Sequence, residues 1–155
     1  MKITLRVVGI QFQKTVEVEG VNPTIEDVMR AAGGGPEQFT YIKAPDGTLQ
    51  AVSAHIPEGH SRSSGRKFAA GLYSLTDGAI SDNMVSTWQW YLVRDGRQVN
   101  VPNAEIERFS DPLPPEYALA DGDLIVWRLV IVLMGPTVPK SGSAFQSKLA
   151  RHRRY

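Results

Sequence analysis

The sequence predicts an α+β domain in which a mixed β-sheet is crossed by one helix. Two segments of alternating apolar and polar residues come first, at 2–8 and 12–19. A stretch with helical spacing follows at 24–33. A late run, 123–134, consists almost wholly of Leu, Ile, Val, Met and Trp. Such a run is typical of a strand buried on both faces, so we expect it in mid-sheet, parallel to the first strand.

The first two segments predict an N-terminal β-hairpin. Ile3, Leu5 and Val7 alternate with polar residues and therefore share one face of a strand. Phe12, Val16 and Val18 do the same in the second segment. Gly9 and the polar residues near it fit the turn between the two strands.

The third segment predicts a helix of about two to three turns. Thr24 is a typical N-cap, and acidic residues follow in the first turn, where the helix dipole favours them. Apolar residues recur at helical spacing at Ile25, Val28, Met29 and Ala32. We expect Gly33–Gly35 to end the helix. Because these glycines follow a helix, they cannot present a helix N-terminus to a phosphate.

The middle of the chain predicts hairpins interrupted by less regular segments. In order, these are a hairpin over 39–52, a long polar loop over 57–67, an ambiguous segment over 68–87, and a hairpin over 88–99. Short β-branched and aromatic runs around Gly-containing turns are typical of hairpins. We expect residues 42–87 to cover the face of the sheet that the helix leaves open.

Charge and composition predict one domain with a basic tail. The chain has 155 residues with 17 basic and 16 acidic side chains, but residues 140–155 carry no acidic side chain. A stretch rich in Pro, Gly and Ser precedes that end. We therefore expect a single domain over 1–135 and a flexible basic tail over 136–155.

Several classes of protein are disfavoured by composition. The chain contains no cysteine, which excludes disulfides and cysteine-bound metal. The 123–134 run is too short to span a bilayer, and the N-terminus lacks the unbroken apolar stretch of a secretory signal. We expect a cytoplasmic protein without membrane contact.

Two parts of the sequence resemble β-grasp proteins. Met1–Val7, Thr15–Glu19 and Thr24–Val28 resemble the opening of ubiquitin-like proteins, which also run from a hairpin through a Thr-Ile-Glu cap into a helix. Trp88–Gly96 and Tyr117–Trp127 resemble the C-terminal half of transcobalamin-type β-grasp domains. The resemblance implies a β-grasp (ubiquitin-like) mixed sheet with one crossing helix and an elaborated middle.

An aromatic cluster offers one candidate site. On a strand, Trp88 and Trp90 share one face and Tyr91 takes the other. The tryptophans either fill the core against Trp127 or belong to an exposed protein-binding platform. We prefer the first interpretation and keep all three residues as candidate protein-binding residues.

The polar loop offers a second candidate site. Its serine hydroxyls, backbone N–H groups and cations can contact an anion, with His60, Arg62, Arg66 and Lys67 as the candidate residues. The P-loop spacing is absent, and a mobile loop without a ligand is the alternative that we prefer. His55, Glu58 and His60 do not match a standard metal site, so we expect neither a metal nor another cofactor.

The tail offers a third candidate site, through the cations Lys148, Arg151, Arg153 and Arg154. It can bind a protein partner, bind nucleic acid through phosphates, or serve as a solubilising end. No catalytic grouping is recognisable, and a turn before a buried strand explains Asp121 and Asp123. We therefore expect a non-enzymatic, ubiquitin-like module acting through protein–protein contacts. The alternatives are a domain for cobalamin or another flat cofactor, and a nucleic-acid-binding protein.

Overall fold

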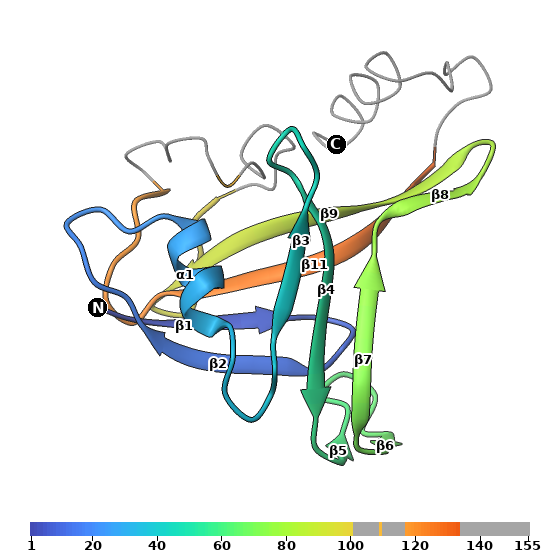
Figure 1. The fold of residues 1–155 in the computed structure, drawn as a ribbon, viewed down its shortest axis with the longest axis horizontal. Coiled ribbons are helices and arrows are strands. Elements are labelled where there is room, and N and C mark those ends of the chain that lie inside the picture. The colour runs from blue at the N-terminus through green and yellow to red at the C-terminus, as the bar shows by residue number, and fades with distance from the viewer. Residues whose placement is uncertain (101–108, 110–116, 134–155) are drawn as a thin grey trace.

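A computed structural model describes residues 1–100, 109 and 117–133 of the chain (Figure 1). Within these residues the strands form a six-stranded sheet, a three-stranded sheet and a short two-stranded hairpin, accompanied by one helix. This confirms the α+β class with a mixed sheet and a single helix. The predicted domain end at 135 and the tail at 136–155 lie outside the described residues.

The six-stranded sheet pairs the beginning of the chain with its last described strand. Its spatial order is β10 (Arg97–Gln98), β9 (Met84–Arg94), β11 (Leu124–Leu133), β1 (Lys2–Val7) and β2 (Phe12–Glu17), and β8 (Gly78–Ser81) also pairs with β9. The strands β1 and β2 form the predicted hairpin. Leu5 lies opposite Ile125 in a parallel pairing of β1 with β11, as predicted. All other pairings in this sheet are antiparallel.

The helix α1 (Ile25–Ala32) begins at the predicted cap. The hydroxyl of Thr24 accepts a hydrogen bond from Asp27 N at 3.2 Å, and the Asp27 carboxylate accepts one from Thr24 N at 2.8 Å. This reciprocal capping box satisfies N–H groups that the first helical turn leaves without partners. Gly33 ends the helix in an extended conformation. Within the described residues, no helix is long and apolar enough to cross a membrane.

The middle of the chain is more regular than its sequence predicts. β3 (Thr40–Lys43), β4 (Leu49–Ile56) and β7 (Gly71–Thr76) form the three-stranded sheet, and β5 (Gly59–His60) pairs with β6 (Lys67–Phe68). The segment over 68–87, which the sequence leaves ambiguous, therefore contains β7, β8 and the start of β9, and the 57–67 loop contains residues of β5 and β6. Partly buried and exposed residues alternate along β7, and antiparallel pairing with β4 over its whole length holds it as a strand.

One face of the large sheet carries the core. The side chains of Leu5, Trp90 and Trp127 are at most 1% exposed on this face. The three-stranded sheet packs on it, since Phe39 stacks on Phe12 with ring centroids 4.6 Å apart. The helix belongs to the same core through its four buried apolar residues.

The expectation that residues 42–87 cover the opposite face is therefore wrong. The chain leaves β7 and enters β8 after one residue, and β8 joins the edge of the large sheet (Figure 1). This connection curls the three-stranded sheet over the face on which the helix already packs. The opposite face carries polar contacts toward β2, such as the Thr4–Thr15 hydroxyl pair at 2.8 Å, whereas Val85, Thr87 and Val126 are buried on it.

The last strand is buried on both faces only in its first half. Ile125, Val126 and Trp127 are at most 1% exposed, whereas Ile131 and Leu133 are 63% and 69% exposed. The reason lies in the pairing, because β1 extends along β11 only as far as Trp127. Beyond that point β9 is the only described strand that pairs with β11.

Two carboxylates secure the start of β11. Asp123 is fully buried and accepts two bonds from the Arg94 guanidinium, both at 2.8 Å, and one from Ala120 N at 2.6 Å. Asp121 accepts one bond from Lys2 N at 2.6 Å. Asp123 therefore ties β11 to β9, and Asp121 ties it to β1.

We predict that Asp123→Ala lowers the free energy of unfolding by about 3 kcal/mol, because it leaves a partly buried guanidinium and a backbone N–H without their acceptor. Asp121→Ala, which removes one exposed bond, should cost about 1 kcal/mol or less. Urea denaturation of both variants measures the difference. Equal losses would contradict the assigned role of Asp123.

We also predict that the capping box loses strength in acid. The hydrogen bond from the Thr24 backbone lowers the pKa of Asp27 below its ordinary value of 3.8. The carboxylate therefore stabilises the fold above that value, and the contribution is lost as the pH falls through the folded-state pKa. The stability difference between the wild type and Asp27→Asn should shrink from pH 6 to pH 3 in urea denaturation. A difference that stays constant would contradict this assignment.

Candidate anion-binding site

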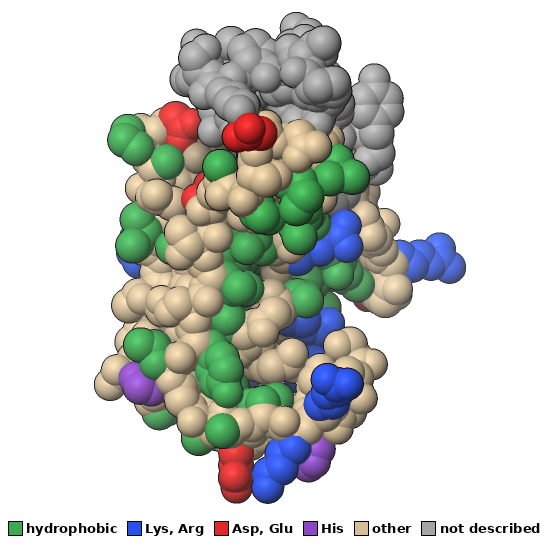
Figure 2. All heavy atoms as spheres, turned by 90° about the vertical axis from the view of Figure 1, so that its right-hand side faces the viewer, with side chains coloured by type: hydrophobic (Ala, Val, Ile, Leu, Met, Phe, Trp, Pro, Cys, Tyr) green, Lys and Arg blue, Asp and Glu red, His purple; other side chains and the backbone are tan. Residues whose placement is uncertain are grey.

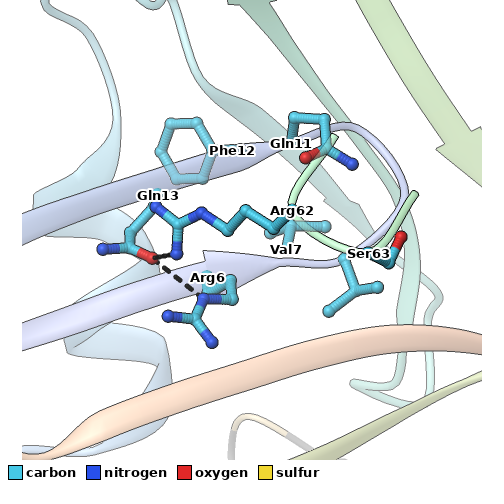
Figure 3. Close-up of a pocket in the computed structure, with 8 residues that line it drawn as sticks. Arg6, Val7, Gln11, Phe12, Gln13, Arg62 and Ser63 are labelled. Carbon is cyan, nitrogen blue, oxygen red and sulfur yellow. Dashed lines mark hydrogen bonds between the residues drawn. The ribbon is translucent and has the colours of Figure 1, made fainter. Parts of the chain in front are cut away.

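The candidate site lies where the turn between β1 and β2 meets the β5–β6 hairpin. A pocket of about 320 Å³ is found there (Figure 3). It is lined by Arg6, Val7, Val8, Gln11, Phe12, Gln13, Arg62 and Ser63. Segments about fifty positions apart in the chain therefore build one site, as the hydrogen bond between residues 13 and 62 shows.

Two arginines converge in this pocket on one neutral oxygen. Arg6 Nε donates to Gln13 Oε1 at 2.9 Å, and Arg62 Nη1 donates to the same oxygen at 2.6 Å (Figure 3). Neither arginine forms an ion pair with an acidic side chain of the described residues, and no Asp or Glu lines the pocket. Each guanidinium keeps further N–H donors, so the pair can bind a carboxylate or phosphate.

The local fold explains how Arg6 and Gln13 meet. They lie opposite each other in the β1–β2 register and point away from the core face. The turn that joins the strands needs glycine at position 9, where φ is 106°. A Cβ added to Gly9 would lie 2.7 Å from Leu75 Cδ1, so glycine also lets β7 pack against this turn.

Hydrogen bonds order the turn of the β5–β6 hairpin, which carries Arg62 and Arg66. Ser61 N donates to Arg66 O and Gly65 N donates to Ser61 O, both at 2.8 Å. Ser64 and Arg66 donate their N–H groups to serine hydroxyls of the same turn. These four backbone donors are already used, so the Arg62 and Arg66 side chains are the cationic contacts that the turn offers to an anion.

A second pocket, of about 170 Å³, shares Gln11 with the first. It is lined by Gly9, Ile10, Gln11, Ser61, Arg66, Lys67, Phe68 and Tyr73. The rings of Phe68 and Tyr73 meet edge to face at 6.4 Å. Figure 2 shows Lys and Arg side chains gathered in the lower part of the face where β5 and β6 lie in Figure 1. The two pockets therefore belong to one basic surface.

The structure places three of the four predicted loop residues at these pockets. Arg62 lines the first, Arg66 and Lys67 line the second, and His60 lines neither. Three lining residues, Arg6, Gln11 and Gln13, are not among those predicted from the sequence. Two of them could have been found from the sequence. Once the register of the hairpin is assigned, Arg6 and Gln13 occupy polar positions that face each other.

The other predicted site residues lie elsewhere. Trp88 and Trp90 are each 1% exposed, so the core interpretation describes them and neither offers a binding surface. Tyr91 lies on the opposite face, where the Arg128 guanidinium sits 5.5 Å from its ring centroid. The tail cations Lys148, Arg151, Arg153 and Arg154 lie outside the described residues. In the described part of the chain, no three His, Asp or Glu side chains gather as metal ligands would.

Comparisons of the chain with protein-family models, characterised proteins and solved structures find no match. Over its described residues, the chain is an α+β domain with a curled mixed sheet and one helix, compatible with a β-grasp arrangement. In the described part of the chain, the two arginine-lined pockets are the candidate binding surface.

We predict that Gln13→Glu supplies the arginines of the first pocket with a counter-charge from the chain itself. A carboxylate between Arg6 and Arg62 should raise Tm by up to about 3 °C, and high salt should remove the gain because salt screens exposed charges. Gln50→Glu is the matched control, since Gln50 is an exposed residue of β4 and lines neither pocket. Scanning calorimetry compares them, and equal shifts would contradict the convergence of the two arginines.

Proposed function

We propose that the protein is a non-enzymatic binding module of β-grasp, ubiquitin-like type, which contacts an acidic segment of a partner protein through Arg6 and Arg62. The observation that carries the proposal is their convergence on Gln13 Oε1 without an acidic partner among the described residues. Two guanidinium groups this close repel each other, and an incoming anion relieves the repulsion.

The energetic gain is sufficient for a specific contact. A carboxylate held by charged hydrogen bonds contributes about 1.5–3 kcal/mol, which corresponds to roughly 10- to 150-fold in affinity. Arg6 is half-buried and Arg62 is exposed, so the contribution of Arg62 lies at the lower end and depends on salt.

The surroundings of the arginines favour a protein over a small ion. Val8 is 45% exposed beside them and lines the same pocket. An exposed apolar side chain next to arginines is typical of protein interfaces, where arginine is enriched and apolar area is buried. A partner segment can therefore place a carboxylate between the guanidinium groups and an apolar side chain on Val8.

The topology supports the β-grasp assignment. A hairpin leads into a capped helix, and the last described strand returns parallel to the first. The proposal is preferred to the flat-cofactor alternative because the tryptophans that would stack on such a molecule are buried. The nucleic-acid alternative depends on tail residues outside the described part of the chain.

We predict that Arg62→Gln weakens binding of a glutamate-rich peptide at least threefold, since it removes one of the two cations of the pocket. Arg97→Gln is the matched control, because Arg97 is exposed beside the turn that follows β9 and lines neither pocket. Isothermal titration calorimetry at low and high salt measures the affinities. Equal effects of the two substitutions would show non-specific attraction and would refute the proposed site.

A further inference from the structure

The basic surface contains two pairs of cations, one in each of the two pockets that Gln11 lines. Arg6 and Arg62 line the first pocket, and Arg66 and Lys67 line the second. Gln11 belongs to both linings, so the pockets are neighbours that share one wall. Within the described residues, no member of either pair forms an ion pair with an Asp or Glu.

From this arrangement we propose that the site has two anion subsites and that the partner segment carries two acidic side chains, one for each pocket. The inference rests on the proposed function and goes further, because it specifies how many acidic side chains of the partner the site binds. A single carboxylate would leave one pair of cations without a counter-charge. Two like-charged pairs on one small surface are best neutralised by two anions.

The turn of the β5–β6 hairpin keeps the two subsites at a set separation. Arg62 and Arg66 flank this turn, and the bond from Ser61 N to Arg66 O at 2.8 Å closes it. The serine hydroxyl contacts inside the turn restrain it further. One cation of each pair belongs to this turn. The site therefore selects a ligand by the distance between its two negative charges.

The wall between the pockets fits a peptide that links the two charges. Gln11 holds φ at 59° in the turn after β1, and its carboxamide can both donate to and accept from a peptide unit. In the second pocket, the Tyr73 hydroxyl already donates to Ala69 O at 2.5 Å. Its ring and that of Phe68 therefore supply apolar surface for the aliphatic part of a glutamate.

The experiment uses the full chain and synthetic Gly/Ser peptides of equal length. One peptide carries a single glutamate, and the others carry two glutamates separated by a stepwise increasing number of residues. NMR titrations follow the side-chain Nε–H signals of Arg6, Arg62 and Arg66. We expect the best-spaced two-glutamate peptide to bind roughly 3- to 10-fold more tightly than the single-glutamate peptide.

Variants assign that preference to the second subsite. The double variant Arg66→Gln/Lys67→Gln should bind the single-glutamate peptide as the wild type does and should lose the preference for two glutamates. The double variant Arg6→Gln/Arg62→Gln should lose affinity for both peptides. Arg97→Gln, which removes an exposed charge outside both pockets, should change neither result.

The outcomes separate the two proposals. If the wild type binds the single-glutamate peptide through Arg6 and Arg62 but gains nothing from a second glutamate at any spacing, the two-subsite inference is overturned and the proposed function stands. If no acidic peptide moves the Arg6 and Arg62 signals, the proposed function fails, and the inference fails with it. If a single-stranded oligonucleotide moves the same signals at lower concentration than every peptide, the site is a nucleic-acid site and both proposals are overturned.

Discussion

The pairing of the first strand with the last is the constraint on which the rest of the structure depends. The hydrogen bond from Lys2 N to the Asp121 carboxylate joins residues 119 positions apart, and the parallel ladder continues from Thr4 to Val7. Closing so long a loop has a large entropic cost, which apolar burial on the core face must offset. The ion pair between the partly buried Arg94 and the buried Asp123 then ties this ladder to β9, so one short region connects three strands.

The geometry of the candidate site depends on the parallel pairing of β1 with β11. β1 carries Arg6, and the turn after it carries Gln11, so both positions follow from where the ladder holds β1. The second contribution comes from the curled sheet, which brings Leu75 against Gly9 and the β5–β6 turn against Gln13. The basic surface thus exists because two layers of the fold meet at the end of one hairpin.

Among the described residues, Arg94 differs from the pocket arginines Arg6 and Arg62 in how its charge is matched. Arg94 gives two hydrogen bonds to a buried carboxylate, and this contact raises the pKa of its guanidinium above the ordinary value. Its charge is matched within the chain and serves stability. Arg6 and Arg62 share a neutral amide oxygen, and their charge is not matched by any acid of the described residues. The same side chain is structural in one setting and available for binding in the other.

Local patterns in the sequence determined the N-terminal hairpin, the capping box at Thr24 and the parallel closing strand, because alternation, cap chemistry and an unbroken apolar run each act over a few residues. They also identified Arg62, Arg66 and Lys67 as cations of one segment. Tertiary structure alone decided that the helix and the three-stranded sheet share one face, that β11 is exposed beyond Trp127, and that Arg6 meets Arg62. Those outcomes depend on which distant segments pack together, and the periodicity of a strand specifies a face without specifying what lies against it.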